Sequence, residues 1–195
     1  MAVTDSRTPG ALRPTSSDNE TGLMDPLRQW ISELIGLRLD LVRASWRPKP
    51  GTQPALKTDW CALALKSLDT TPAYLDGRKG DPSLPLSGDQ TSVVHEDYEF
   101  VLSFYGPRAL FLVHDMEDAI REIEQIGQNR SLLRQSGLTL KAVDSQAMRL
   151  PDLVCETWVD RYDMTFHVAR KVSRTYGVRT IVGADVDFYT ERGKL

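Results

Sequence analysis

Apolar residues recur along this chain with the spacing of helices in some stretches and of strands in others. The first helix is predicted to begin near Asp25-Pro26, because Asp caps free N–H groups of a first turn and Pro needs no N–H partner there. Leu27, Ile31 and Leu34 then follow at helical spacing and share one face. We therefore expect an amphipathic helix that weakens near Gly36.

A longer helix is predicted over residues 107–126. Apolar residues recur on one of its faces, and acidic residues cover much of the remainder. The apolar positions are Leu112, Met116, Ala119, Ile123 and Ile126. Gly127 suits the end of this helix, and a short helix, NRSLLRQSG, follows and ends at Gly137.

Alternation of apolar and polar residues predicts the strands. They cover residues 39–46, 57–69, 93–105, 138–142, 158–168 and 178–189. Both faces of 57–69 are largely apolar, which favours a central strand covered on both sides, with a short helix as the alternative. In the strand predicted at 93–105, one face consists of Tyr98, Phe100, Leu102 and Phe104. In the strand predicted at 158–168, one face consists of Trp158, Tyr162, Met164, Phe166 and Val168.

The order of these elements is helix, strands, helix, strands. This order favours an α+β fold, with a mainly antiparallel sheet packed against two principal helices, over a doubly wound parallel sheet. Residues 1–22 are rich in Ser, Thr, Pro and Asp and are predicted to form a flexible arm. Residues 23–195 are predicted to form a single domain. From it the segment 70–92, dense in Gly, Pro, Asp and Ser, projects as a long loop or hairpin.

Composition excludes several classes of protein. The chain has 195 residues, of which 41% are hydrophobic and 26% charged, so it can bury a core and is not disordered throughout. No apolar run approaches the roughly 20 residues that cross a bilayer, and the polar start lacks the apolar region of a signal peptide. A net charge of -3 argues against a dedicated nucleic-acid-binding protein. The two cysteines show no metal or redox spacing and fit a reducing compartment.

Residues capable of catalysis are present but form no known catalytic pattern. His95, His114 and His167 fall on a strand, a helix and another strand, so only the fold could bring them to one metal ion. Glu96 and Asp97 are neighbours on a strand and point to opposite faces, which argues against a catalytic carboxylate pair. Asp97 and Glu99 do share a face, but charged residues on the outer face of a strand are the simpler explanation. We therefore predict no catalytic residue, no metal site and no cofactor.

Two basic segments are candidates for contact with other molecules. The tetrapeptide Gly77-Arg78-Lys79-Gly80 is typical of a solvated turn, because no helix start follows it as in a phosphate-binding loop. A second basic group suits a solvated strand end, with nucleic-acid phosphates or an acidic protein surface as the alternative. It consists of Arg170, Lys171, Arg174 and Arg179.

Several longer motifs follow one another in a characteristic order. They are Asp59-Trp60 at the start of a strand, YEFVLSFYG running into PRALFLVHDMEDAI, then NRSLLRQSGL, and finally RLPDLVCETWVDRYDMTFHVARKVSRTYGV. The most specific part is Glu156-x-Trp158-Val159-x-Arg161-Tyr162-Asp163, preceded by Leu150-Pro151. Over residues 25–190 this order resembles that of phage neck and tail-terminator proteins.

The resemblance implies a structural virion protein of the phage neck, with an α+β fold and no catalysis. It implies a closed ring of about six copies, a homohexamer, that caps the tail tube and meets the head-side connector or stopper protein. DNA would pass through the lumen without sequence-specific binding. The sheath protein is a further expected partner if the tail is contractile, and no membrane is expected. The protein would assemble in the cytoplasm of the bacterial host and reside in the virion neck.

Four residues are predicted to lie at interfaces of this assembly. Arg161 and Asp163 share one strand face and could pair across a subunit boundary or within one chain. Arg78 and Lys79 lie in the projecting segment, which could reach a neighbouring copy.

Other functions remain open at this stage. A head-completion or connector protein one ring higher is the alternative within the same class. A small intracellular hydrolase that uses one of the histidines with nearby carboxylates belongs to a different class. A nucleic-acid-binding module using residues 170–179 is a third alternative.

Overall fold

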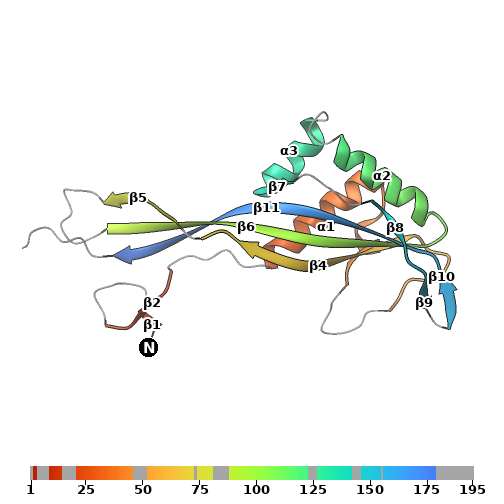
Figure 1. Ribbon diagram of the computed structural model, residues 1–195, viewed down its shortest axis with the longest axis horizontal. Coiled ribbons are helices and arrows are strands. Elements are labelled where there is room, and N and C mark those ends of the chain that lie inside the picture. Colours follow the sequence, from red (N-terminus) through yellow and green to blue (C-terminus); the bar gives the residue numbers. More distant parts are fainter. Residues whose placement is uncertain are drawn as a thin grey trace, which may run out of the picture. The chain divides into compact units, whose positions relative to one another are not determined.

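The computed structural model describes residues 2–3, 9–14, 21–45, 52–72, 74–80, 88–122, 127–141, 146–154 and 156–178, with 2–3, 21, 74–80 and 88–90 described by their backbone (Figure 1). The chain divides into two compact units. The smaller consists of Met1–Ser17, Ala73–Val93 and Ser173–Leu195, and the larger of Asp18–Pro72 and Val94–Val172. Two long strands, β6 (Gly88–Tyr105) and β11 (Arg161–Val178), contribute residues to both.

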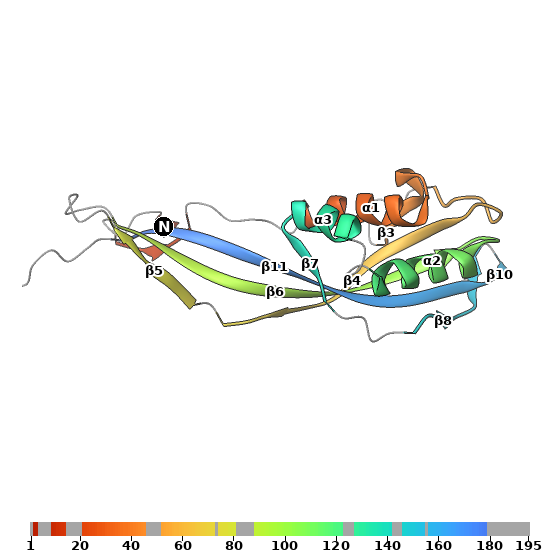
Figure 2. The same cartoon turned by 90° about the horizontal axis from the view of Figure 1, so that it is seen from above.

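The larger unit consists of a layer of helices on one face of a sheet (Figure 2). The sheet order is β3-β4-β6-β11-β7, with β3 at Val42–Ala44, β4 at Trp60–Thr70 and β7 at Leu138–Leu140. Strand β4 runs antiparallel to β6, and β11 runs antiparallel to β7 and to β8 (Met148–Arg149). The short β3 pairs in parallel with β4. The predicted α+β fold is confirmed.

The helices are α1 (Thr21–Ile35), α2 (Ala109–Arg121) and α3 (Gly127–Gln135). The predicted start of the first helix is wrong, because α1 begins at Thr21 and contains Pro26. The extra turn buries Leu23 against the core, which compensates for the backbone hydrogen bond that Pro26 cannot make.

The predicted extent of the second helix is also wrong. Helix α2 ends at Arg121, and Gly127 is the first residue of α3 rather than a cap of α2. Ile120, which the helical spacing omitted, is buried, whereas Ala119 is only partly so. Ile123 and Ile126 lie outside the described residues. The short helix at NRSLLRQSG is confirmed, and Gly137 follows it at φ 72°.

The core lies between the sheet and the helices. Alternation along β6 places Tyr98, Phe100, Leu102 and Phe104 on the helix side, all at most 1% exposed, as predicted. Phe100 stacks on Phe166 of β11 with ring centroids 5.6 Å apart. The helices complete this core with side chains at helical spacing. They are Leu27 and Ile31 of α1, Leu112, Val113 and Met116 of α2, and Leu133 of α3.

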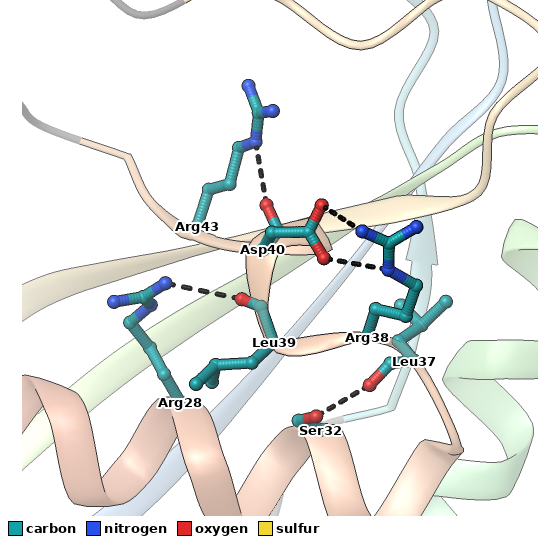
Figure 3. Close-up of polar contacts among 7 residues, drawn as sticks. All are labelled: Arg28, Ser32, Leu37, Arg38, Leu39, Asp40 and Arg43. Atoms are coloured by element: carbon teal, nitrogen blue, oxygen red, sulfur yellow. Dashed lines mark hydrogen bonds and ion pairs between the residues drawn. The ribbon is translucent and has the colours of Figure 1, made fainter.

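The predicted strand 39–46 forms only in part. A 3-10 helix, η1 (Leu39–Leu41), takes its first half, and β3 follows. The Arg28 guanidinium donates to the carbonyl oxygen of Leu39 at 3.2 Å (Figure 3). It also donates to the carbonyl oxygen of Val42 at 2.7 Å and holds this turn against α1. Asp40 in turn accepts a bidentate pair of hydrogen bonds from Arg38. These local hydrogen bonds favour the turn over an extended chain.

The structure differs from one further strand prediction and describes almost nothing of another. Trp158 lies in a separate strand, β10 (Thr157–Val159), and not on the buried face of the long strand. The other predicted members of that face, from Tyr162 to Val168, are confirmed as buried or partly buried. The last predicted strand, 178–189, lies almost entirely outside the described residues.

The smaller unit contains the segment predicted to project. Strand β5 (Tyr74–Gly80) pairs antiparallel with the first part of β6, in a register that joins Tyr74 to Val93 and Gly80 to Gly88. The connecting residues 81–87 lie outside the described part of the chain. Within the predicted arm 1–22, β1 (Ala2–Val3) and β2 (Ala11–Leu12) pair in parallel.

A buried ion pair joins β6 to β11 in the larger unit. Arg170 Nε donates to Glu96 Oε2 at 2.9 Å, and the side chains are only 12% and 8% exposed. The hydroxyl of Tyr98 donates to the same carboxylate, and the guanidinium lies 5.4 Å from the centre of the Tyr98 ring. Burial and the hydrogen bond to Glu96 raise the pKa of Tyr98 to about 12, although Arg170 opposes the shift. Arg170, predicted as part of a solvated basic strand end, is therefore a structural residue.

Replacing Arg170 with Met is expected to destabilise the protein by roughly 3 kcal/mol, because it leaves the Glu96 carboxylate buried without its cation. The matched control is Lys171→Met, which removes an exposed charge one residue away and is expected to change stability by less than about 0.5 kcal/mol. Urea unfolding measures both. Equal effects of the two substitutions would contradict a stabilising role for the pair.

Candidate assembly surface

A groove of about 410 Å³ opens on the larger unit. It lies where the turn before β4, the start of α2 and the hairpin before β11 come together. Its walls are mainly apolar and aromatic, and include Leu56, Trp60, Tyr105, Leu110, Phe111 and Val159. Phe111 is 64% exposed, and Leu56 and Leu110 are also exposed although they are large apolar residues. This concentration of apolar side chains in contact with water is typical of a binding surface.

Two stacked aromatic rings line the groove. Trp60 and Tyr105 are register partners on the β4–β6 ladder, and their rings lie nearly parallel with centroids 4.3 Å apart. Both residues alternate with the core residues of their strands, so they face away from the helices. Burial raises the pKa of Tyr105 to about 12, partly offset by the charge of Arg161, so the phenol stays neutral at physiological pH.

A tight turn at Gly106 connects β6 to α2 beside the groove. Gly106 has φ 105°, and a Cβ there would lie 2.6 Å from the carbonyl oxygen of Thr58 and 2.6 Å from the carboxylate of Asp59. That Asp59 carboxylate accepts a hydrogen bond from the Arg108 N–H at 2.8 Å, directly before α2 begins. The carboxylate satisfies one of the free N–H groups at the helix start, as an N-cap side chain would.

A two-stranded hairpin forms another wall. Strands β9 (Asp152–Val154) and β10 pair antiparallel, with Trp158 opposite Leu153. Val154 and Val159 lie on the face that lines the groove. Because side chains alternate along a strand, Trp158 and Leu153 lie on the other face. There they are 71% and 55% exposed, so both faces of the hairpin carry apolar side chains.

Charged residues tie the base of this hairpin to the sheet. Arg161 donates to Asp152 at 3.2 Å and to Asp163 at 2.8 Å, and the Tyr105 hydroxyl donates to Asp152 at 3.1 Å. Burial lowers the pKa of Arg161, but the hydrogen bond and charge of Asp163 raise it more, so the guanidinium stays charged. The predicted pair of Arg161 and Asp163 therefore forms within one chain, which was one of the two options that the sequence left open.

The family assignment follows from comparison of the sequence with protein families. Residues 21–192 match the family of phage neck terminator proteins. The chain belongs to this family. No curated protein matches it. The family gives this neck terminator a structural role in the virion neck and implies contacts with other phage head or tail proteins. None of the helices in the described ranges is long and apolar enough to cross a membrane.

The other two predicted interface residues lie elsewhere. Arg78 and Lys79 are on β5 of the smaller unit, in the part described by its backbone alone. They stay predicted interface residues. The groove itself was not predicted from the sequence. Asp59-Trp60 and the segment around Trp158 were nevertheless among the motifs that carry the resemblance.

The residues considered for catalysis form separate pairs in the described part of this neck terminator, and His114 Nδ1 lies 3.4 Å from Glu117 Oε2. Within the described ranges, no three His, Cys, Asp or Glu side chains could hold a metal ion together. Asp97 pairs with Lys141, and Glu99 with Lys66 at 2.6 Å, whereas Glu96 is buried on the opposite face of β6. Burial raises the pKa of the Cys61 thiol to about 12, which makes it a poor nucleophile at neutral pH.

Replacing Gly106 with Ala is expected to destabilise the protein and distort the groove, because the new methyl group meets two oxygen atoms at 2.6 Å. The control is Gly137→Ala, where φ is also positive but no atom lies within 4 Å, so only backbone strain of about 1 kcal/mol applies. Thermal unfolding should show a loss for Gly106→Ala larger than that of the control by at least about 1 kcal/mol. A loss no greater than the control's would show that the close approach at Gly106 is unimportant.

Proposed function

We propose that this neck terminator forms a closed ring of about six copies that caps the tail tube and joins the tail to the head-side connector or stopper protein. DNA passes through the ring without sequence-specific binding, and in a contractile tail the sheath protein is a further partner. The ring assembles in the cytoplasm of the bacterial host and remains in the virion. The chain acts as a structural part of the neck and not as an enzyme.

The apolar surface around the groove supports the proposal independently of the family assignment. Phe111, Leu110 and Leu56 line the groove and are exposed, and Trp158 and Leu153 are exposed on the adjoining hairpin. An isolated subunit would leave these side chains in water at a cost of about 25 cal/mol for each Å² of apolar surface. Burial between proteins recovers that free energy, so the surface suits an assembly protein.

The charge of the chain is compatible with a DNA conduit. Its net charge is -3, so a ring of such subunits carries no overall positive charge that would hold DNA phosphates. In addition, Arg170, the first residue of the basic group, is paired with Glu96. These two facts favour free passage of DNA over a stable complex with it.

The capping activity can be tested with tail tubes that polymerise from purified tube protein. The wild-type protein is expected to stop tube growth and to be found at tube ends by electron microscopy. Phe111→Ser, which removes an exposed apolar ring from the groove, should raise the concentration needed for capping at least about tenfold. Leu68→Ser is the control, because Leu68 is an exposed apolar residue of β4 that does not line the groove.

The result also separates this function from its alternatives. Tubes that grow unchanged in the presence of the wild-type protein would contradict the terminator function. Binding to heads that carry the portal, without binding to tubes, would instead assign the protein to the connector one ring higher.

A further inference from the structure

The groove and the exposed face of the β9–β10 hairpin complement each other. We propose that they are the two halves of the contact between neighbouring copies, in which Trp158 of one copy enters the groove of the next. This inference rests on the proposed function, because it specifies how the ring is closed. The chemistry required is already present on one chain, an aromatic knob on one surface and an aromatic-lined hollow on another.

The knob is the cross-strand pair of Trp158 and Leu153. It lies on a hairpin whose base is fixed by the charged contacts of Asp152, so the indole is presented by a rigid ribbon. Tryptophan is prominent among residues that dominate binding energy, because one rigid side chain buries a large apolar area. A Trp that is 71% exposed therefore marks this face as a contact.

The groove, which is the hollow in this contact, has the size and lining to receive the Trp158 side chain. Its volume of about 410 Å³ falls within the ordinary range for sites that enclose a ligand of several rings. The stacked rings of Trp60 and Tyr105, with Phe111 beside them, offer aromatic faces and edges to an entering indole.

The placement of knob and hollow favours a ring over a symmetric dimer. The hairpin lines the groove with one face and presents Trp158 and Leu153 on the other. Knob and hollow therefore lie on opposite sides of the same ribbon. A contact between two different surfaces of one chain is heterologous, and it forms a closed ring when the rotation between copies closes.

Charge at the two surfaces is complementary as well. The turn of the hairpin carries the exposed Glu156 next to the knob. Lys57 and Arg108, both exposed, directly follow the lining residues Leu56 and Pro107 in the chain. Two acidic residues also lie at the groove, but Asp160 is paired with Arg149 at 2.6 Å and Asp59 accepts the N–H of Arg108. Opposite charges at the edge of a contact steer association and fix its register.

Charge reversal and its rescue test the contact, with association measured by sedimentation velocity for the protein alone and by electron microscopy on tail tubes. Glu156→Lys is expected to weaken association between copies at least about tenfold, and so is the pair Lys57→Glu with Arg108→Glu. Combining all three substitutions in one chain should restore most of the association between copies, because the opposite charges attract again with their signs exchanged. Trp158→Ala should weaken association at least as strongly, whereas Met148→Ala, at an exposed apolar residue outside the contact, should not.

The outcomes separate this contact from the proposed function. If the wild-type protein forms rings and caps tubes while every variant assembles like it, the contact is wrong and the function stands. If the variants form rings but no longer bind tubes, the surface binds the tube protein, and the contact is again wrong. If the wild-type protein forms rings neither alone nor on tubes, the proposed function itself fails. Circular dichroism and thermal unfolding of each variant confirm that a loss of association is not a loss of folding.

Discussion

The register between β4 and β6 is the constraint on which the rest of the larger unit depends. It sets Cys61 opposite Phe104 and Leu63 opposite Leu102 on the helix side, and Trp60 opposite Tyr105 on the outer side. A slip of one residue would turn each of these side chains to the wrong face. The core and the aromatic pair of the groove are therefore two consequences of one pairing, and the hydrophobic burial that fixes the core also builds the candidate site.

The same register explains how a polar network can sit beside an apolar groove. Because Tyr105 faces outward, its hydroxyl reaches Asp152, which also accepts from Arg161, and Arg161 is held in turn by Asp163. These contacts anchor a short hairpin that has few residues of its own to stabilise it. The charged residues hold the hairpin in place, and the apolar side chains on its outer face stay exposed, where a partner can bind them.

The sequence predicted what depends on periodicity and missed what depends on tertiary contact. Alternation along β6 identified the core face from Tyr98 to Phe104 because each of those side chains is buried by the same layer of helices. The start of α1 was missed because burial of Leu23 outweighs the presence of Pro26, and local pattern cannot weigh the two. Trp158 was assigned to the apolar face of the long strand because its spacing fits β11, although β10 pairs with β9 instead. The groove joins segments that are distant in sequence, so no local signal could describe it, whereas the pairing of Arg161 with Asp163 could be anticipated from their shared strand face.

Assembly of the neck is expected to cover the surface around the groove. Hydroxyl-radical footprinting, read by mass spectrometry on the free protein and on assembled necks, measures this directly. Oxidation of Trp158 and Phe111 should fall several-fold on assembly, while oxidation of Leu68, exposed outside the groove, should stay nearly constant. Unchanged oxidation of Trp158 and Phe111 in assembled necks would contradict the account.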